Sequence, residues 1–342
     1  HSAYRAFNNL DLINWMNSNG VATKVERGGR VFPVSDRAAD VVSAFVRTLG
    51  KLNVTLLTGQ AVQKLIIADK KIQGAVTDCS TYTADAVIIA TGGATYPGTG
   101  SSGDGYKLAK QAGHTVTAIK PSLVPLEVGE EWIGELQGLS LKNVSATALV
   151  NGKKVAEDFG EMLFTHYGLS GPIILSLSKY VAVGLEGKKG DIHIEINLKP
   201  ALSEEVLDKR IQRDWEKFSR KQVKNSLGEL LPTKLIPVII DLAYLNPDAF
   251  INQITKAERQ RLVRLLQHLS FTITKTRPVS EAIVTAGGVS IKEINPATME
   301  SKLLNNLYVV GELLDVDGYT GGYNLQAAFS TGYVAGKAAA KE

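Results

Sequence analysis

Hydrophobic and polar positions along the chain follow two different periods. Apolar residues at helical spacing predict helices over residues 6–19, 37–49 and 104–112, and a longer helical stretch over 202–269. Short apolar runs predict strands at 21–25, 54–57, 83–90 and 113–119, with a hairpin formed by 61–67 and 72–78. Shorter alternating segments predict further strands at 124–128, 144–150, 153–157, 192–198, 271–276 and 282–291.

These changes of period divide the chain into an α/β domain, a β-rich insertion and a nested helical insertion. The predicted boundaries are 1–120 for the first part of the α/β domain, 121–200 and 270–292 for the two parts of the β-rich insertion, 201–269 for the helical insertion, and 293–342 for the second part of the α/β domain.

The most informative stretch lies near the C-terminus. The apolar run at 307–310 predicts a buried strand, and Gly311 and Glu312 follow it, where open α/β sheets bind ligands. Gly321 and Gly322 then open a helix whose first amide groups lack intrahelical partners and favour an electron-rich group. A carboxylate and bare amides suit a flavin dinucleotide, although similar turns occur in α/β proteins that bind nothing.

A second glycine turn follows another buried strand. Thr91, Gly92 and Gly93 end the apolar run at 86–90, and small residues at a strand end let a dinucleotide approach the sheet. We therefore expect the turns around Gly92 and Gly322 to converge on one cofactor.

The composition indicates the class of protein but does not indicate which reaction it catalyses. With 342 residues, 44% of them hydrophobic and 21% charged, the chain reads as a globular protein of two or three domains. No apolar run is long enough for a transmembrane helix, and the single Cys79 fits a reducing cytoplasm. The histidines show no metal-ligand spacing, so no metal site is expected.

The net charge of +4 gives little support to a nucleic-acid partner. The basic residues are scattered apart from those at 217–224, which read as a solvated helix face. The sequence does not predict an oligomeric state.

Several motifs together resemble those of a known family, the bacterial NAD(P)/FAD-dependent oxidoreductases of the aminoacetone oxidase type. The matching segments are GRVFP at 29–33, ATGG at 90–93, YPGTGSSGDG at 96–105, LFTHYGLSGP at 163–172, VTAGGVS at 284–290, EINP at 293–296 and the glycine-rich stretch 311–324. They run in order along the whole chain. The resemblance implies a Rossmann-like FAD-binding domain that carries a β-barrel-like insertion and a nested helical domain.

The resemblance also implies roles for individual residues. The implied FAD contacts are Val62, Thr91, Gly92, Gly93, Gly311, Glu312, Gly321, Gly322, Tyr323, Asn324 and Leu325. Val62 is equally consistent with an ordinary valine in a strand that has no role in cofactor binding. The N-terminal Gly-x-Gly-x-x-Gly segment of the family, with its first βα unit, is missing from this chain, so we expect weakened FAD binding or none if that segment is truly absent.

Catalytic residues are harder to infer. His166 is a candidate general base or substrate contact, or else a structural histidine. Arg30 is a candidate contact for an anion, with a surface salt bridge as its alternative, and Tyr319 either covers the flavin or only packs.

The expected function is that of a flavoprotein that passes electrons between a small organic substrate, such as an amine, and oxygen or NAD(P). One alternative is a flavin-associated RNA-modifying or RNA-binding protein, for which the sequence pI of about 8.9 leaves room. The other alternative is an inactive truncated fragment of the flavoprotein.

Overall fold

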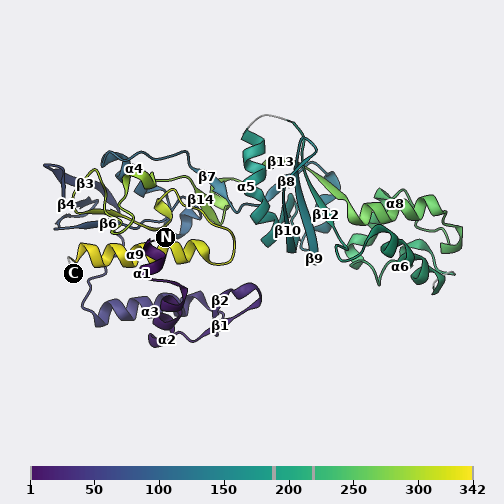
Figure 1. Ribbon diagram of the computed structural model, residues 1–342, viewed down its shortest axis with the longest axis horizontal. Helices are drawn as coiled ribbons and strands as arrows, with labels where there is room; N and C mark the ends of the chain where they lie inside the picture. The colour runs from purple at the N-terminus through teal and green to yellow at the C-terminus, as the bar shows by residue number, and fades with distance from the viewer. Residues whose placement is uncertain (1, 187–189, 218–219, 341–342) are drawn as a thin grey trace. The chain divides into compact units, whose positions relative to one another are not determined.

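The structure is a computed structural model that describes residues 2–186, 190–217 and 220–340. Contacts divide the chain into two compact units, each with its own hydrophobic core (Figure 1). The first unit joins residues 1–122 to residues 279–342, and the second consists of residues 123–278. The second unit is therefore an insertion into the first.

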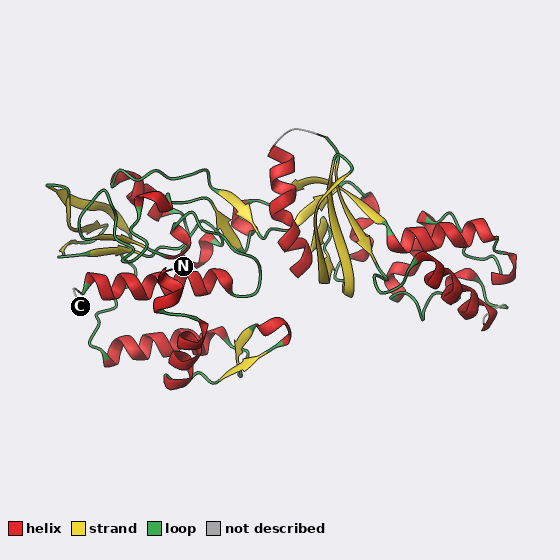
Figure 2. Ribbon diagram, in the orientation of Figure 1, coloured by secondary structure: helices red, strands yellow, loops and turns green. Residues whose placement is uncertain are grey.

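The first unit combines helices with several small sheets (Figure 2). Its helices are α1 (Ser2–Ala6), α2 (Asn9–Ser18), α3 (Ala38–Lys51), α4 (Asp104–Gln111) and α9 (Tyr323–Ala339). Its strands are β1 (Thr23–Val25), β2 (Val31–Pro33), β3 (Val62–Ala68), β4 (Lys71–Thr77), β5 (Thr81–Thr83), β6 (Val87–Ile89), β7 (Lys120–Ser122), β14 (Val284–Ala286) and β15 (Leu307–Val309).

The centre of the first unit is the parallel pair β6 and β15. The pair aligns Val87 with Leu307 and Ile89 with Val309, so both strands end at the same edge. All three residues of β15 are buried, as expected for a short apolar run in a parallel sheet. Strands β3, β4 and β5 form an antiparallel sheet, while β7 pairs with β14 and β1 with β2.

Helix α9 connects this parallel pair to the N-terminal helices. It packs against β6 and β15, and its aromatic side chains reach the helices that precede them in sequence. The ring of Phe329 stacks on Phe45 of α3, which stacks on Trp15 of α2, and Phe7 stacks on Tyr333. Stacked rings of this kind add to the stability that burial alone provides.

The second unit contains a closed β-barrel and helices. Its strands are β8 (Leu126–Val128), β9 (Ser140–Val150), β10 (Lys153–Phe164), β11 (Gly168–Ser170), β12 (Ile192–Asn197) and β13 (Leu269–Thr276). Its helices are α5 (Pro172–Glu186), α6 (Glu204–Lys217), α7 (Ile236–Leu242) and α8 (Lys256–Gln267). The barrel closes in the strand order β10-β11-β8-β13-β12-β9.

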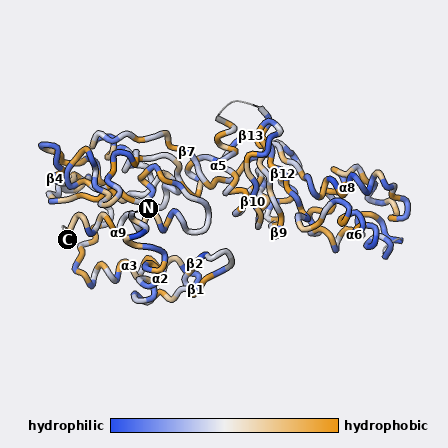
Figure 3. Tube along the Cα trace, viewed as in Figure 1, coloured by the Kyte–Doolittle hydropathy of each residue, from blue (hydrophilic) through white to orange (hydrophobic). Residues whose placement is uncertain are grey.

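Period-two alternation explains the barrel. Along β12, isoleucines at 192, 194 and 196 are buried and the polar residues between them are partly exposed. Hydrophobic and hydrophilic positions are interspersed throughout the chain (Figure 3). Helix α5 packs on β10 and β9 through a buried apolar stripe that includes Ile174, Leu177 and Val181. Gly171 has a φ of +90°, and a Cβ there would lie 2.7 Å from the Cα of Met162, so only glycine fits this approach.

The predicted fold class agrees with this architecture, since an α/β unit carries an inserted closed barrel with helices. Several local predictions are wrong. The helix predicted over 6–19 forms as α2 but begins later, at Asn9, because Asn8 caps it by accepting from the Leu10 amide at 2.8 Å while Asp11 accepts from the Asn8 amide. Residues 54–57 form no strand, and residues 113–119 form only an isolated bridge between Val116 and Val289.

Residues 279–292 belong to the first unit, whereas the pattern groups them with the β-rich insertion. The reason is strand pairing: β14 pairs with β7, with Val284 opposite Ser122. The helical stretch over 202–269 forms α6, α7 and α8 with 3-10 turns between them. The predicted helix face at 217–224 is not one helix among the described residues, since α6 is described to Lys217 and a 3-10 turn follows at Val223–Asn225; residues 218–219 lie outside the described residues.

Among the described residues, no helix is both long enough and apolar enough to cross a membrane.

Candidate functional site

The two glycine turns that follow β6 and β15 lie against each other. A Cβ built on Gly93 would come within 2.5 Å of Glu312 Oε1 and within 2.2 Å of Thr285 Oγ1. The amide of Val310 also donates to the carbonyl oxygen of Ile89 at 3.2 Å. Since real Cβ atoms do not approach other atoms so closely, glycine at position 93 is what allows the Glu312 carboxylate to reach the first turn.

Thr285 joins three segments that are far apart in the sequence. Its amide donates to Glu312 Oε1 at 2.7 Å, and its own Oγ1 accepts from the Ala94 amide at 2.8 Å. Its side chain is fully buried on β14. Thr285 lies within a motif of the family resemblance, but the pattern alone gives it no role, because the sequence does not show which segment β14 faces.

Tyr106 of α4 contacts the same turn from another side. Its hydroxyl donates to the backbone oxygen of Glu312 at 3.5 Å. Burial raises the pKa of Tyr106 to about 12, with the Glu312 charge acting in the same direction and a hydrogen bond to Thr285 partly opposing it. A tyrosine phenol is neutral near pH 7 at its ordinary pKa, and the raised pKa of Tyr106 keeps it a hydrogen-bond donor to higher pH.

Helix α9 begins with an open N-terminus. Gly322 is its N-cap, with a φ of +94°, and no side chain caps the first turn. A Cβ on Gly322 would have no atom within 4 Å. The Asn324 side chain instead binds the preceding loop, accepting from the Gly318 amide at 2.7 Å and donating to the Gly318 oxygen at 3.1 Å. The first amides of α9 are therefore free of side-chain caps and carry the positive end of the helix dipole.

The end of β15 connects the two turns to α9. The amide of Gly311 donates to Thr331 Oγ1 at 3.0 Å, and a Cβ on Gly311 would lie 3.6 Å from the Ala328 Cβ. Gly311 and Glu312 thus contact α9 on one side and the Gly93 turn on the other. These contacts reach α9 at Ala328 and Thr331, beyond its first turn, so the convergence of the Gly92 and Gly322 turns stays a prediction.

This arrangement fits a flavin nucleotide chemically. Glu312 is half-buried and uses Oε1 for the Thr285 amide, while its Oε2 makes no hydrogen bond to the described residues and can accept from a sugar or ribityl hydroxyl. The uncapped amides at Tyr323 and Asn324 suit the electron-rich edge of a flavin, where negative charge develops on reduction.

The predicted cofactor residues other than Val62 lie in two groups in the first unit. Those at the two strand ends are Thr91, Gly92, Gly93, Gly311 and Glu312, and those at the start of α9 are Gly321, Gly322, Tyr323, Asn324 and Leu325. Val62 begins β3 opposite Thr77, is 39% exposed, and belongs to a different sheet from the two strand ends.

The predicted catalytic residues are more dispersed. Tyr319 is exposed in the loop before α9, where its backbone oxygen accepts from Asn324 at 3.4 Å. Arg30 lies on the β1–β2 hairpin, with its guanidinium 5.9 Å from the centre of the Phe32 ring. His166 belongs to the second unit, in the turn between β10 and β11.

His166 is part of a polar and aromatic cluster at the barrel. Its ring lies edge-on to Tyr167, with 4.8 Å between centroids, and the Arg277 guanidinium lies 4.6 Å from the centre of the Tyr167 ring. Arg277 also pairs with Glu127 at 2.6 Å. Burial raises the pKa of Glu127, but hydrogen bonds and charges from Arg277 and Lys275 outweigh it and leave the pKa below its usual value.

The chain does contain one segment with the glycine spacing of a phosphate-binding loop. The spacing Gly-x-Gly-x-x-Gly does occur once, at Gly98, Gly100 and Gly103, directly ahead of α4. Here it follows a 3-10 turn instead of a strand, and Asp104 occupies the first turn of the helix, held by Ser102 at 2.6 Å and Lys107 at 2.9 Å. A carboxylate in that position disfavours a phosphate, so this loop is not a dinucleotide fingerprint.

Comparison with known proteins agrees with this geometry. The family model described as the HI0933-like protein Rossmann domain matches residues 1–338. The chain belongs to this family. Its Rossmann domain is of the FAD-binding kind, which confirms the predicted resemblance at the level of the family and supports an oxidoreductase.

Three curated relatives of this HI0933-like chain have names of two kinds. The 3-dehydro-bile acid delta(4,6)-reductase of Clostridium scindens is 35% identical over 334 residues, which cover 97% of this chain and 80% of the relative. The ribosomal RNA dihydrouridine synthases of Haemophilus influenzae and Escherichia coli are 32% and 30% identical, each match covering 97% of this chain and 80% or 79% of the relative.

Among solved structures, Mycobacterium smegmatis Sdh1 in complex with UQ1 has a TM-score of 0.39 and 16% identity. The match covers 97% of this chain and 54% of Sdh1, and it is too distant to inform function.

Proposed function

We propose that this protein is an FAD-dependent reductase that saturates a carbon–carbon double bond conjugated to a carbonyl group. The observation that carries the proposal is the contact of the Gly93 turn with Glu312, combined with the open N-terminus of α9, in a chain of a flavoprotein family. The proposal narrows the expected oxidoreductase activity to one direction and one type of bond.

The names of the relatives support the type of bond. A delta(4,6)-reductase acting on a 3-dehydro bile acid reduces double bonds conjugated to a ketone. A dihydrouridine synthase produces a uracil base whose C5–C6 bond is saturated, and in uracil that bond is conjugated to the C4 carbonyl. Both names therefore describe the addition of two electrons and two protons to an electron-poor alkene.

The chain's own residues would hold the cofactor and the substrate in defined ways. The amides that open α9 and the Glu312 carboxylate would bind the flavin, which when bound supplies the hydride chemistry. Tyr106 would hold the Glu312 backbone in place through the hydrogen bond from its hydroxyl. NADH or NADPH is the proposed electron source, so that one nicotinamide and one proton are consumed for each double bond reduced.

Flavin binding is tested first, with a matched pair of glycine variants. Gly93→Ala places a methyl group on Glu312 and Thr285, whereas Gly98→Ala adds one where no atom lies within 4 Å. We expect Gly93→Ala to weaken FAD binding at least about tenfold in a fluorescence titration, and Gly98→Ala to bind as the parent protein does. Equal affinity for all three proteins would refute the site.

Turnover is tested next under anaerobic conditions. The FAD-loaded protein is mixed with NADH or NADPH, then with a cyclic enone or a uridine nucleotide, and products are analysed by mass spectrometry. We expect a nicotinamide to bleach the flavin and the product to gain two hydrogen atoms. Bleaching by an amine and reoxidation by oxygen, with no alkene reduced, would instead favour the amine oxidation that the family resemblance implies.

The roles of His166, Tyr319 and Arg30 stay predictions. Loss of turnover without loss of FAD affinity in His166→Gln, Tyr319→Phe or Arg30→Gln would assign each residue to the reaction. A protein that binds no FAD at all would agree with the alternative of an inactive fragment.

A further inference from the structure

The loop over residues 315–322 leads from the end of β15 to the uncapped amides that open α9. Its residues are all described, and none of them lies in a helix or a strand. The position of the loop therefore depends on contacts with neighbouring segments. Asp315 and Asp317 carry its two carboxylates, and both side chains are partly buried. Because a buried carboxylate needs hydrogen-bond donors, the donors to these two residues show what holds the loop.

Thr117 is the donor to the first carboxylate. Its hydroxyl donates to Asp315 Oδ2 at 3.0 Å and accepts from the Gly288 amide at 2.9 Å. The single hydroxyl proton goes to the carboxylate, which is closer than the Gly288 oxygen at 3.2 Å and carries a charge. The Asp315 amide also donates to the Val289 oxygen at 3.0 Å. One hydroxyl thus joins the segments that follow α4, β14 and β15.

Ser122 is the donor to the second carboxylate. Its hydroxyl donates to Asp317 Oδ2 at 2.9 Å. Ser122 is 1% exposed and ends β7, where it lies opposite Val284 of β14. A buried side chain on a paired strand has little freedom to move, so this bond anchors Asp317 to the pair of β7 and β14.

Two glycines bring the segments of this network into close contact. A Cβ on Gly287, which has a φ of +82°, would lie 2.1 Å from the Ala118 oxygen. A Cβ on Gly288 would lie 2.6 Å from the Leu313 oxygen. Real Cβ atoms do not approach other atoms so closely, so only glycine lets this segment pass between the Thr117 segment and the end of β15. The hydroxyl of Thr117 is thereby held within reach of the loop.

The far end of the loop is attached to α9 itself. The Asn324 side chain binds the Gly318 backbone, directly after the residue that Ser122 holds. The loop is therefore attached to β7 through one of its residues and to α9 through the next. Gly321 and Gly322, whose conformations open the helix, follow within a few residues.

We propose that Thr117 and Ser122 are positioning residues for the flavin. Their hydroxyl groups hold Asp315 and Asp317, and so hold the loop that presents the first amides of α9. Neither hydroxyl contacts the cofactor in this proposal, because each donates its proton to a loop carboxylate. A displacement of about 1 Å is enough to weaken a polar site, so the loss of either hydroxyl would reach the flavin through the loop. The proposal rests on the proposed function, since it assigns the loop to a flavin.

The first measurement needs no flavin. Hydrogen–deuterium exchange of the whole protein is followed by mass spectrometry in a peptide that covers residues 315–322. Thr117→Val and Ser122→Ala are each expected to raise the exchange rate of this peptide about tenfold, because the loop opens more often without its donor. Thr117→Ser keeps a hydroxyl and should keep the parent rate.

Two other hydroxyl groups provide matched controls. Thr48 and Ser226 each donate to a backbone oxygen outside this network, at 2.8 Å in both cases. Thr48→Val and Ser226→Ala therefore repeat the same chemical changes elsewhere in the chain. They should leave the exchange rate of residues 315–322 unchanged.

The second measurement is a fluorescence titration with FAD. Thr117→Val and Ser122→Ala should each weaken FAD binding about tenfold, which is the loss expected for one hydrogen bond to a charged group. Thr117→Ser should bind FAD as the parent does. Asp317→Asn combined with Ser122→Ala should lose no more affinity than Ser122→Ala alone, because the hydroxyl acts only through that carboxylate. A general loss of stability would not produce this pattern of rescue and coupling.

Several outcomes would overturn the proposal. These are an unchanged exchange rate in Thr117→Val and Ser122→Ala, faster exchange with no loss of FAD affinity, an equal loss of affinity in Thr48→Val, and additive losses for Ser122→Ala and Asp317→Asn. A parent protein that binds no FAD would instead refute the proposed function, and the flavin role of the two hydroxyls with it. Exchange measured without flavin distinguishes that result from a failure of the hydroxyls to hold the loop.

Discussion

The two units of the molecule achieve stability in different ways. In the second unit, the closed barrel, α5 and the helices of the insertion share one continuous apolar core. In the first unit, short strands and turns are joined by polar contacts around Thr285, Glu312 and Tyr106, and large apolar side chains such as Val42, Leu52 and Leu56 are more than half exposed. A closed barrel leaves no strand edges, whereas β6 and β15 form a two-stranded sheet.

This difference suggests that the second unit contributes mainly stability and that the first unit contributes the ligand-binding site. Both units have an apolar core, but only in the first do hydrogen-bonded glycine turns leave backbone groups available to a cofactor at the proposed site. We therefore expect substitutions in the barrel core to cost mainly stability and substitutions at the turns to affect ligand binding as well.

The largest effect is expected in the barrel core. Phe164 on β10 is fully buried with its ring centre 5.9 Å from that of Phe271, while Phe159 on the same strand is 53% exposed. Phe164→Ala should lower the free energy of unfolding by about 3–5 kcal/mol, and Phe159→Ala by about 0.5 kcal/mol. Urea unfolding followed by tryptophan fluorescence measures both, and similar losses for the two variants would contradict the barrel core described here.

A pH-dependent effect is expected in the first unit. Because the pKa of Tyr106 is raised to about 12 in the folded protein, the unfolded chain loses its proton first as pH rises above about 10. Stability should therefore fall by about 2–3 kcal/mol between pH 10 and pH 12, relative to Tyr106→Phe. Tyr96→Phe, at an exposed tyrosine, is the control, and parallel pH profiles for the parent and Tyr106→Phe would disprove the assignment.

A smaller effect is expected at the junction of the turns. Thr285→Val keeps the shape of the side chain but removes the acceptor of the Ala94 amide, and should cost about 1–3 kcal/mol in urea unfolding. Thr285→Ser retains the hydroxyl and should recover most of that stability. If Thr285→Val is also unchanged in FAD affinity, the turns do not depend on this hydroxyl for their ligand-binding geometry.

The smallest effect is expected in the cluster around His166. The lowered pKa of Glu127 means that its ion pair with Arg277 stabilises the protein above the unfolded pKa of about 4.3, and that this stability is lost as pH falls through the folded pKa. Glu127→Gln should cost about 1 kcal/mol at pH 7 and nothing at pH 2. Glu161→Gln, at an exposed position on β10, should show no such pH dependence in the same unfolding assay.

Much of the architecture follows from sequence periodicity. Strong alternation predicts β12 and the hairpin of β3 and β4, and the change of period near residue 200 predicts the helical insertion. Residues 54–57 and 113–119 have the composition of strands but form none, because strand formation depends on a neighbouring edge that composition does not reveal. The same reason explains why β14 was grouped with the wrong domain.

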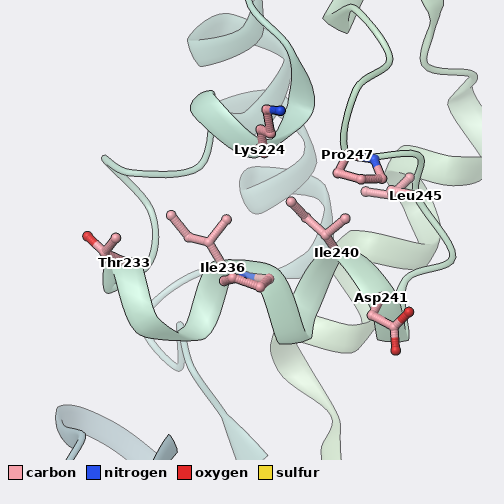
Figure 4. Close-up of a pocket in the computed structure, with 8 residues that line it drawn as sticks. Lys224, Thr233, Ile236, Ile240, Asp241, Leu245 and Pro247 are labelled. Carbon is pink, nitrogen blue, oxygen red and sulfur yellow. The ribbon is translucent and has the colours of Figure 1, made fainter. Parts of the chain in front are cut away.

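The candidate site was predictable only in part. The residues at Gly93, Glu312 and Gly322 follow from glycine turns placed after strands and before a helix. Thr285 and Tyr106 do not, since each acts through a contact with a segment more than twenty residues away. Likewise, the basic residues at 217–224 can be found in the sequence. The position of Phe250 opposite Gln222 and the apolar hollow lined by Ile236 and Ile240 (Figure 4) depend on tertiary structure.

The side chain of Asn324 has a consequence for the start of α9. By binding the backbone of Gly318 at both its oxygen and its nitrogen, it fixes the approach of the loop before any guest molecule arrives. A ligand that binds there would meet a loop that is already ordered. Its binding free energy would therefore not include the entropic cost of ordering that loop.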